Sequence, residues 1–125
     1  MLTHDQLQDQ CKLIKRMLEV SSYFNGVTVT VSKHDGNTDV FEFGGNLFIE
    51  VRYDPDGVHR YLPGYNKTYA NTSTTEQVYT GQDRSLHGAV VNLVTWMFME
   101  QLQLTMDTWT TKDSCNTELE VLRSV

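Results

Sequence analysis

The sequence of 125 residues predicts a single α+β domain with two helices and an antiparallel sheet. The prediction depends on an amphipathic period near the N-terminus, a period-two alternation between residues 27 and 62, and an apolar stretch at 86–104. We expect an N-terminal helix, a β-meander of four to five strands, and a hydrophobic helix packed across that sheet. The chain is long enough to bury one core but too short for two.

The first helix is predicted from Thr3 to about Phe24. Thr3 and Gln6 have the spacing of a capping box, in which each side chain binds the backbone amide of the other. Asn25 and Gly26 tolerate the left-handed conformation at helix ends, so we expect the helix to stop there. The apolar stripe that faces the core is Leu7, Cys11, Ile14, Met17 and Leu18.

The middle of the chain predicts strands joined by tight turns. Valines alternate with Thr and Ser over 27–32, as in a strand with one buried face. Further strands are expected at 39–43, 47–53 and 58–62, separated by Gly-containing turns. Because the turns are short, neighbouring strands should pair in antiparallel fashion.

The segment 63–83 is polar, and only 77–80 resembles a short strand. A long polar connection inside a small domain is uncommon, and it is either mobile or functional. Its tyrosines lie among small hydrogen-bonding residues, a composition typical of binding loops. We therefore interpret the segment as either a recognition loop or a solvated excursion.

The apolar stretch 86–104 predicts the second helix, with Asp83 as its N-cap. Its apolar side chains cover well over half of the helix circumference. Such a helix is either buried on more than one side or meets another protein. The second possibility predicts a two-fold homodimer, with an interface formed by Val91, Val94, Trp96 and Phe98. The ending 118–125 fits either an edge strand or a short helix.

Composition and charge exclude several function classes. The formal net charge of −6 disfavours direct binding to nucleic acid or to anionic membranes. The N-terminus lacks the apolar run of a signal peptide, and the apolar stretch is too short to span a bilayer, so we expect a cytoplasmic protein. Cys11 and Cys115 form no CxxC pair, which predicts free thiols rather than a metal or redox site.

The sequence contains one candidate chemical site, a group of histidines and carboxylates in two turns: His34, Asp35, Asp54, Asp56 and His59. Such groups can bind a divalent metal or exchange protons, if the two turns lie at one end of the sheet. Tight turns favour Asp and Gly in any case. No nucleophile elbow, phosphate loop or zinc motif is present. We therefore predict no catalytic residue, no metal site and no cofactor.

The function predicted from these patterns is a non-enzymatic protein-binding module, either an adaptor or an inhibitor. The expected contact residues are the tyrosine-rich segment, Tyr61, Tyr65, Asn66, Tyr69, Asn71 and Tyr79, and the acidic hairpin edge, Glu42, Glu50, Asp54 and Asp56. One alternative is a small-ligand or nucleotide-binding protein, or a small hydrolase, that uses the His/Asp turn cluster. Another is an acidic nucleic-acid mimic that blocks a protein handling nucleic acid.

Overall fold

The structure confirms the predicted α+β fold. It is a computed structural model that describes residues 1–57, 59–69 and 73–110. Its elements in order are α1 (His4–Leu18), the 3-10 helix η1 (Ser22–Phe24), β1 (Val29–His34), β2 (Thr38–Phe43), β3 (Leu47–Tyr53), β4 (His59–Thr68), β5 (Thr75–Tyr79) and α2 (Leu86–Thr110).

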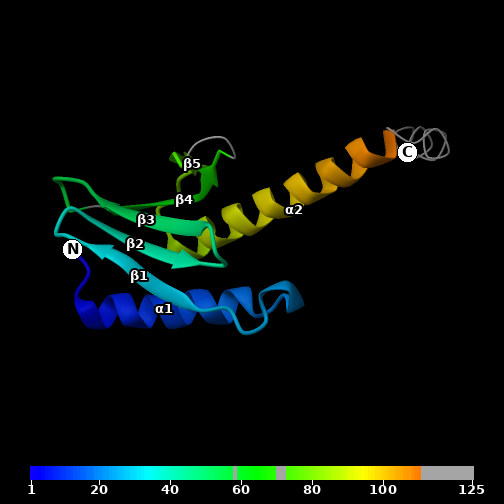
Figure 1. The fold of residues 1–125 in the computed structure, drawn as a ribbon. Coiled ribbons are helices and arrows are strands. Elements are labelled where there is room, and N and C mark those ends of the chain that lie inside the picture. Colours follow the sequence, from blue (N-terminus) through cyan, green and yellow to red (C-terminus); the bar gives the residue numbers. More distant parts are fainter. Residues whose placement is uncertain (58, 70–72, 111–125) are drawn as a thin grey trace. The chain divides into compact units, whose positions relative to one another are not determined.

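The chain divides into two compact units, Met1–Leu93 and Val94–Val125. The first unit holds α1, the whole sheet and the first two turns of α2. Within it, α1 runs alongside the edge strand β1 (Figure 1). The second unit contains the remainder of α2, which continues as a helix to Thr110.

The sheet is an antiparallel meander with the strand order β1-β2-β3-β4-β5. Its short turns explain this order, as at Gly36, where a positive φ of 93° closes the turn between β1 and β2. The strand register gives the sheet two distinct faces, because paired residues point to the same side. Phe41 pairs with Ile49 on one face, and Glu42 pairs with Phe48 on the other.

The core lies between α1 and the sheet face that carries Phe41 and Ile49, which we call the helix face. Gln10 of α1 donates a hydrogen bond to the hydroxyl of Tyr61, a residue of this face, at 3.0 Å. The fully or almost fully buried apolar side chains of α1, the helix face and α2 are Leu7, Ile14, Leu18, Phe41, Ile49, Val51, Ala89 and Leu93.

The capping box at the start of α1 is confirmed, since both of its hydrogen bonds are present. The predicted end near Phe24 is wrong, because α1 stops at Leu18. Ser21 then accepts a hydrogen bond from the Tyr23 amide and begins η1, so local side-chain capping competes with continued helix. Burial raises the pKa of the free Cys11 thiol, which lies on the buried stripe of α1.

The prediction of a long connection at 63–83 is wrong. β4 continues to Thr68, and the chain returns as β5, which pairs with β4 from Gly64 to Thr68. The polar composition misled the prediction, because most side chains of this hairpin beyond Gly64 are exposed or half-buried and need not be apolar. Pairing with the neighbouring strand, and not hydrophobicity, extends β4 here.

The second helix begins at Leu86, where the predicted apolar stretch begins, but another residue caps it and it ends later than predicted. Ser85 is its cap, since its hydroxyl accepts from the Gly88 amide at 3.0 Å, while Asp83 accepts from the Ser85 amide and hydroxyl. In the first unit this helix buries Leu86, Ala89, Val90 and Leu93. Among the described residues, no helix is both long and apolar enough to cross a membrane. The predicted element at 118–125 lies outside the described residues.

Candidate functional site

The structure separates the tyrosines that the sequence grouped together. Tyr61 is a core residue with 3% of its surface exposed, so its ring is not available to a partner. Tyr69 and Tyr79 are 42% and 40% exposed. Tyr65 and Asn66 are half-buried in β4, and Asn71 lies outside the described residues.

The register of the β4–β5 hairpin places the two exposed tyrosines on opposite faces. Tyr79 pairs with Gly64, whereas Lys67 pairs with Glu76. Lys67 lies three positions after Gly64, an odd number, so the two pairs have their side chains on opposite faces. Tyr69 belongs to the second group, because its hydroxyl donates to Glu76 at 2.5 Å and the Lys67 ammonium lies 5.2 Å from its ring centre. The two rings therefore cannot form one contact patch on a flat partner.

Tyr79 lies on the face opposite the helix face, and we call this the Tyr79 face. Its residues, as the strand register gives them, are Thr30, Lys33, Thr38, Val40, Glu42, Phe48, Glu50, Arg52, Arg60, Leu62, Gly64, Asn66, Thr68, Thr75, Gln77 and Tyr79. This face brings together two sets of residues that the sequence predicted separately, the acids of β2 and β3 and a tyrosine of the β5 segment.

Charged neighbours hold the Tyr79 ring in place. Its hydroxyl donates a hydrogen bond to Glu50 Oε1 at 3.3 Å, and Arg52 donates to Glu50 Oε2 at 2.7 Å. The Arg52 guanidinium lies 6.0 Å from the Tyr79 ring centre, at the outer limit of a cation–π contact. Burial, followed by the charge of Glu50, raises the pKa of Tyr79. The phenol therefore stays protonated and acts as a donor near neutral pH.

Gly64 makes room for this arrangement. A Cβ atom at Gly64 would lie 2.3 Å from the Val78 carbonyl oxygen and 2.7 Å from Phe48 Cζ. Without a side chain there, Phe48 packs edge-on against Tyr79, with ring centres 5.6 Å apart. The contact between an aromatic edge and an aromatic face fixes the orientation of the exposed ring.

The predicted acidic edge is only partly assembled. Glu42 and Glu50 lie on the Tyr79 face, and Glu50 is 8% exposed. Asp54 follows the end of β3, where Arg60 donates a hydrogen bond to it at 3.1 Å. Asp56 is an exposed residue of the turn between β3 and β4. The predicted acids therefore lie in two separate places, Glu42 and Glu50 on the Tyr79 face and Asp54 and Asp56 after the end of β3.

The predicted cluster of two histidines and three turn acids is replaced by a different network. His34 Nδ1 and the Tyr53 hydroxyl both form short hydrogen bonds to Asp39, whose side chain is 1% exposed. His59 contacts the Tyr61 hydroxyl at 3.3 Å, and its ring centre lies 6.0 Å from that of Tyr53. Burial and the neighbouring Asp39 carboxylate raise the pKa of Tyr53.

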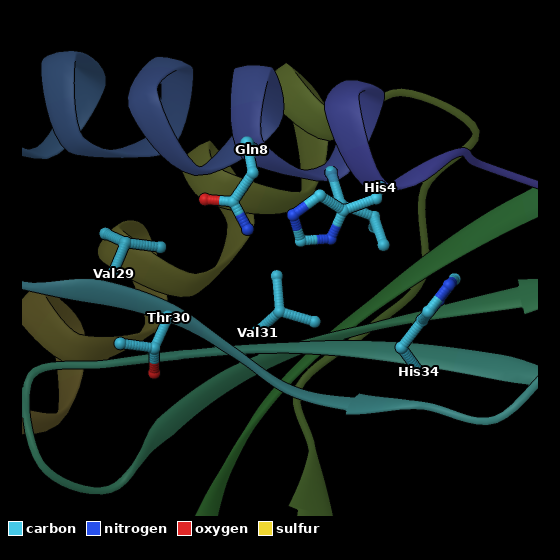
Figure 2. Close-up of a pocket in the computed structure, with 7 residues that line it drawn as sticks. His4, Gln8, Val29, Thr30, Val31 and His34 are labelled. Atoms are coloured by element: carbon cyan, nitrogen blue, oxygen red, sulfur yellow. The ribbon is translucent and has the colours of Figure 1, made fainter.

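His34 also lines a pocket of about 360 Å³ between α1 and β1. In Figure 2, His4 and Gln8 point from α1 toward the sheet, and Val31 and His34 rise from β1 toward α1. A histidine whose one nitrogen is held by a buried carboxylate has a fixed ring orientation, which leaves the other nitrogen for a ligand. In the part of the chain that the structure describes, no three His, Cys, Asp or Glu side chains are placed to hold a metal ion.

The predicted dimer residues differ in exposure. Val91, in the first unit, is 49% exposed, and Phe98, in the second, is 70% exposed. Val94 and Trp96 are half-buried. The α2 interface stays a prediction.

Sequence reasoning missed Asp39, Tyr53 and the pocket residues His4 and Gln8. One signal was available for Asp39, which alternates in phase with Phe41 and Phe43 and so falls on their buried face. His4 and Gln8 gave no such signal, because only the packing of α1 beside β1 brings them near His34. Comparison of the chain with models of protein families, with curated proteins and with solved structures finds no match.

Proposed function

We propose that this chain is a non-enzymatic protein-binding module that docks on a protein partner through the Tyr79 face. The supporting observation is the hydrogen bond from Tyr79 to Glu50, which joins the tyrosine-bearing hairpin to the acidic strand in one surface. Part of each predicted contact region lies on this face, namely Asn66 and Tyr79 of the tyrosine-rich segment and Glu42 and Glu50 of the acidic edge.

Tyr79 has the properties of an interface anchor. Its ring is 40% exposed, yet Phe48, Glu50 and Arg52 restrict it to one position. An ordered aromatic side chain loses little conformational entropy on binding, and tyrosine is enriched among residues that dominate binding energy. The hydroxyl and the ring edge supply polar and apolar contacts at the same point.

The charge of the face indicates the chemistry of the partner. The face carries charges of both signs, with the acids Glu42 and Glu50 beside the bases Lys33, Arg52 and Arg60, while the whole chain carries a net charge of −6. The net charge of the chain speeds the encounter with a basic protein surface, and Glu42 favours a Lys or Arg of that surface beside an apolar patch. Arg52 already neutralises Glu50 in part, so Glu42 is the carboxylate with more to gain from a cation of the partner.

Affinity capture from the native cells tests the proposal with three forms of the protein. We expect the wild type and Tyr23→Ala to retain the same partner, and Tyr79→Ala to lose it. Tyr23 is the matched control, because it is a 73% exposed tyrosine of η1, away from the Tyr79 face. Equal capture by Tyr79→Ala, or the absence of any specific partner, would contradict the proposal.

We propose in addition that the protein acts as a homodimer. The exposed Val91 and Phe98 of α2 are the contact that the sequence predicts. A contact through α2 requires that Phe98→Glu shift the protein to a monomer in sedimentation measurements, because two charged side chains would be placed in an apolar contact, whereas a contact elsewhere leaves Phe98→Glu dimeric.

A second candidate function is the binding of a small ligand, or hydrolysis of one, in the pocket between α1 and β1. The observation that favours it is the Asp39–His34 pair at the pocket wall, since an oriented imidazole can coordinate a ligand or accept a proton. A thermal-shift screen with divalent metals and nucleotides tests this function. A shift that is lost in His34→Ala but kept in His87→Ala would support it.

The nucleic-acid mimic finds less support, because Arg52 and Arg60 already neutralise two of the predicted acids, Glu50 and Asp54. For a mimic, charge reversal at Glu42 should abolish binding, and Tyr79→Ala should leave it intact.

A further inference from the structure

Within the described part of the chain, β5 is an edge strand whose outward backbone groups have no strand beside them. Within the described residues it pairs only with β4. The hydrogen bonds that flank it, from the Thr80 amide to Pro63 and from the Tyr69 amide to Thr74, fix which residues face β4. In the alternating pattern of an antiparallel pair, the amides and carbonyls of Thr75, Gln77 and Tyr79 then point outward.

The two edges of the sheet are protected to different degrees. β1 has an irregularity between Val31 and Lys33, it carries a lysine, and α1 packs beside it. These are the features by which natural proteins prevent unwanted strand pairing. β5 has a regular register, no proline and no lysine, and four of its five residues are exposed. Its residues Thr75, Val78 and Tyr79 all favour extended structure.

The sequence of β5 is complementary to itself in the antiparallel direction. Two copies centred on Gln77 place Gln77 opposite Gln77 of the second copy, where two amide side chains can hydrogen-bond to each other. Thr75 then lies opposite Tyr79 of the second copy. Glu76, the only charged residue of the strand, lies opposite Val78, so no two like charges meet.

We infer that β5 pairs with β5 of a second copy across a two-fold axis and joins the two five-stranded sheets into one. The inference rests on the proposed homodimer and assigns its contact to the sheet edge in place of α2. Joining at β5 also makes the two Tyr79 faces continuous, because Thr75, Gln77 and Tyr79 have their side chains on that face. A partner with two matching sites would then bind with avidity.

Sedimentation equilibrium of the purified full chain tests the β5 contact. We expect the wild type to be a dimer at about 50 µM, a concentration suited to weak interfaces. Gln77→Pro should weaken the dimer at least about tenfold, since it removes an outward amide without breaking a bond to β4. Gln77→Glu and Gln77→Lys should each weaken it as well, because like charges face each other across the axis.

The charged variants provide the decisive result, since an equimolar mixture of Gln77→Glu and Gln77→Lys should restore the dimer. The same two changes at Gln8, an exposed glutamine of α1, are the matched controls and should leave the dimer intact. Circular dichroism confirms that each variant is folded, and the two charged variants alter only an exposed side chain.

Two results would overturn the β5 contact while leaving the homodimer in place. In one, Gln77→Pro associates as the wild type does and Phe98→Glu alone gives a monomer, which assigns the contact to α2. In the other, mixing the charged variants fails to restore the dimer. A monomeric wild type at the same concentration would reject the homodimer itself, without bearing on the proposed partner at the Tyr79 face.

Discussion

Gly64→Ala is expected to destabilise the protein by overfilling the space between β4, β5 and Phe48. The added Cβ would lie 2.3 Å from the Val78 carbonyl oxygen and 3.1 Å from Tyr79 Cα, both of which are backbone atoms. A flexible side chain could rotate away, but these atoms move only if the two strands separate. The cost of inserting one methyl group into such a site is about 1–3 kcal/mol.

An opposing effect must be subtracted from that cost. Gly64 does not have a positive φ, so alanine can adopt its backbone conformation, and the loss of glycine reduces the entropy of the unfolded chain. That effect stabilises by about 0.4–1 kcal/mol. The steric cost is larger, and we expect a net loss of about 1–2 kcal/mol in the free energy of unfolding.

Urea denaturation followed by circular dichroism measures this loss. With an m-value of about 2 kcal/mol/M in urea, the midpoint should fall by about 0.5–1 M. Gly45→Ala is the contrasting variant, since its φ of 84° strains an alanine although no atom lies within 4 Å of the added Cβ. Both variants should lose stability, but only Gly64→Ala should alter the ring contact of Phe48 with Tyr79, which aromatic NMR shifts report. A Gly64→Ala protein as stable as the wild type would refute the reasoning.

Three further predictions concern the buried carboxylate, one turn and the core. His34→Ala should cost about 1–3 kcal/mol, because it removes a hydrogen-bond partner from the nearly inaccessible Asp39 carboxylate. The low end of this range applies if water reaches Asp39 through the space that His34 leaves. The urea midpoint of His34→Ala measures the cost, and an unchanged midpoint would contradict the prediction by showing that the Tyr53 hydroxyl alone satisfies Asp39. Asp35 accepts hydrogen bonds from the backbone amides of Thr38 and Asn37, which lower its pKa to about 2. The ionised Asp35 therefore stabilises the fold fully above the unfolded pKa of about 4, and this stabilisation disappears as the pH falls toward 2. The stability difference between the wild type and Asp35→Ala should therefore shrink over that interval, and a difference independent of pH would contradict the assignment. Leu93→Ala should lose about 2–5 kcal/mol because Leu93 is fully buried, whereas Phe98→Ala, at a 70% exposed position, should change the stability far less; similar losses in thermal or urea unfolding would contradict the burial.

Several features of this protein followed from the sequence by itself, and all of them are local. The capping box of α1 needs only Thr3 and Gln6, and the turn between β1 and β2 needs only the Asp35-Gly36 pair. The period-two alternation and the short turns also predicted the antiparallel order of the strands correctly. In each case, the determining interactions join residues a few positions apart, so their spacing in the sequence carries the information.

Tertiary contacts decided the remainder. β4 extends past Gly64 because β5 pairs with it, although the composition of the segment resembles a loop. Tyr61 is buried and Tyr79 is exposed because of their places in the register, and no difference in their local sequence shows this. The Asp39–His34 pair and the contact of Tyr79 with Glu50 join different strands. The free energy of such contacts depends on which strands are neighbours and on which face a side chain lies, and only the folded sheet determines both.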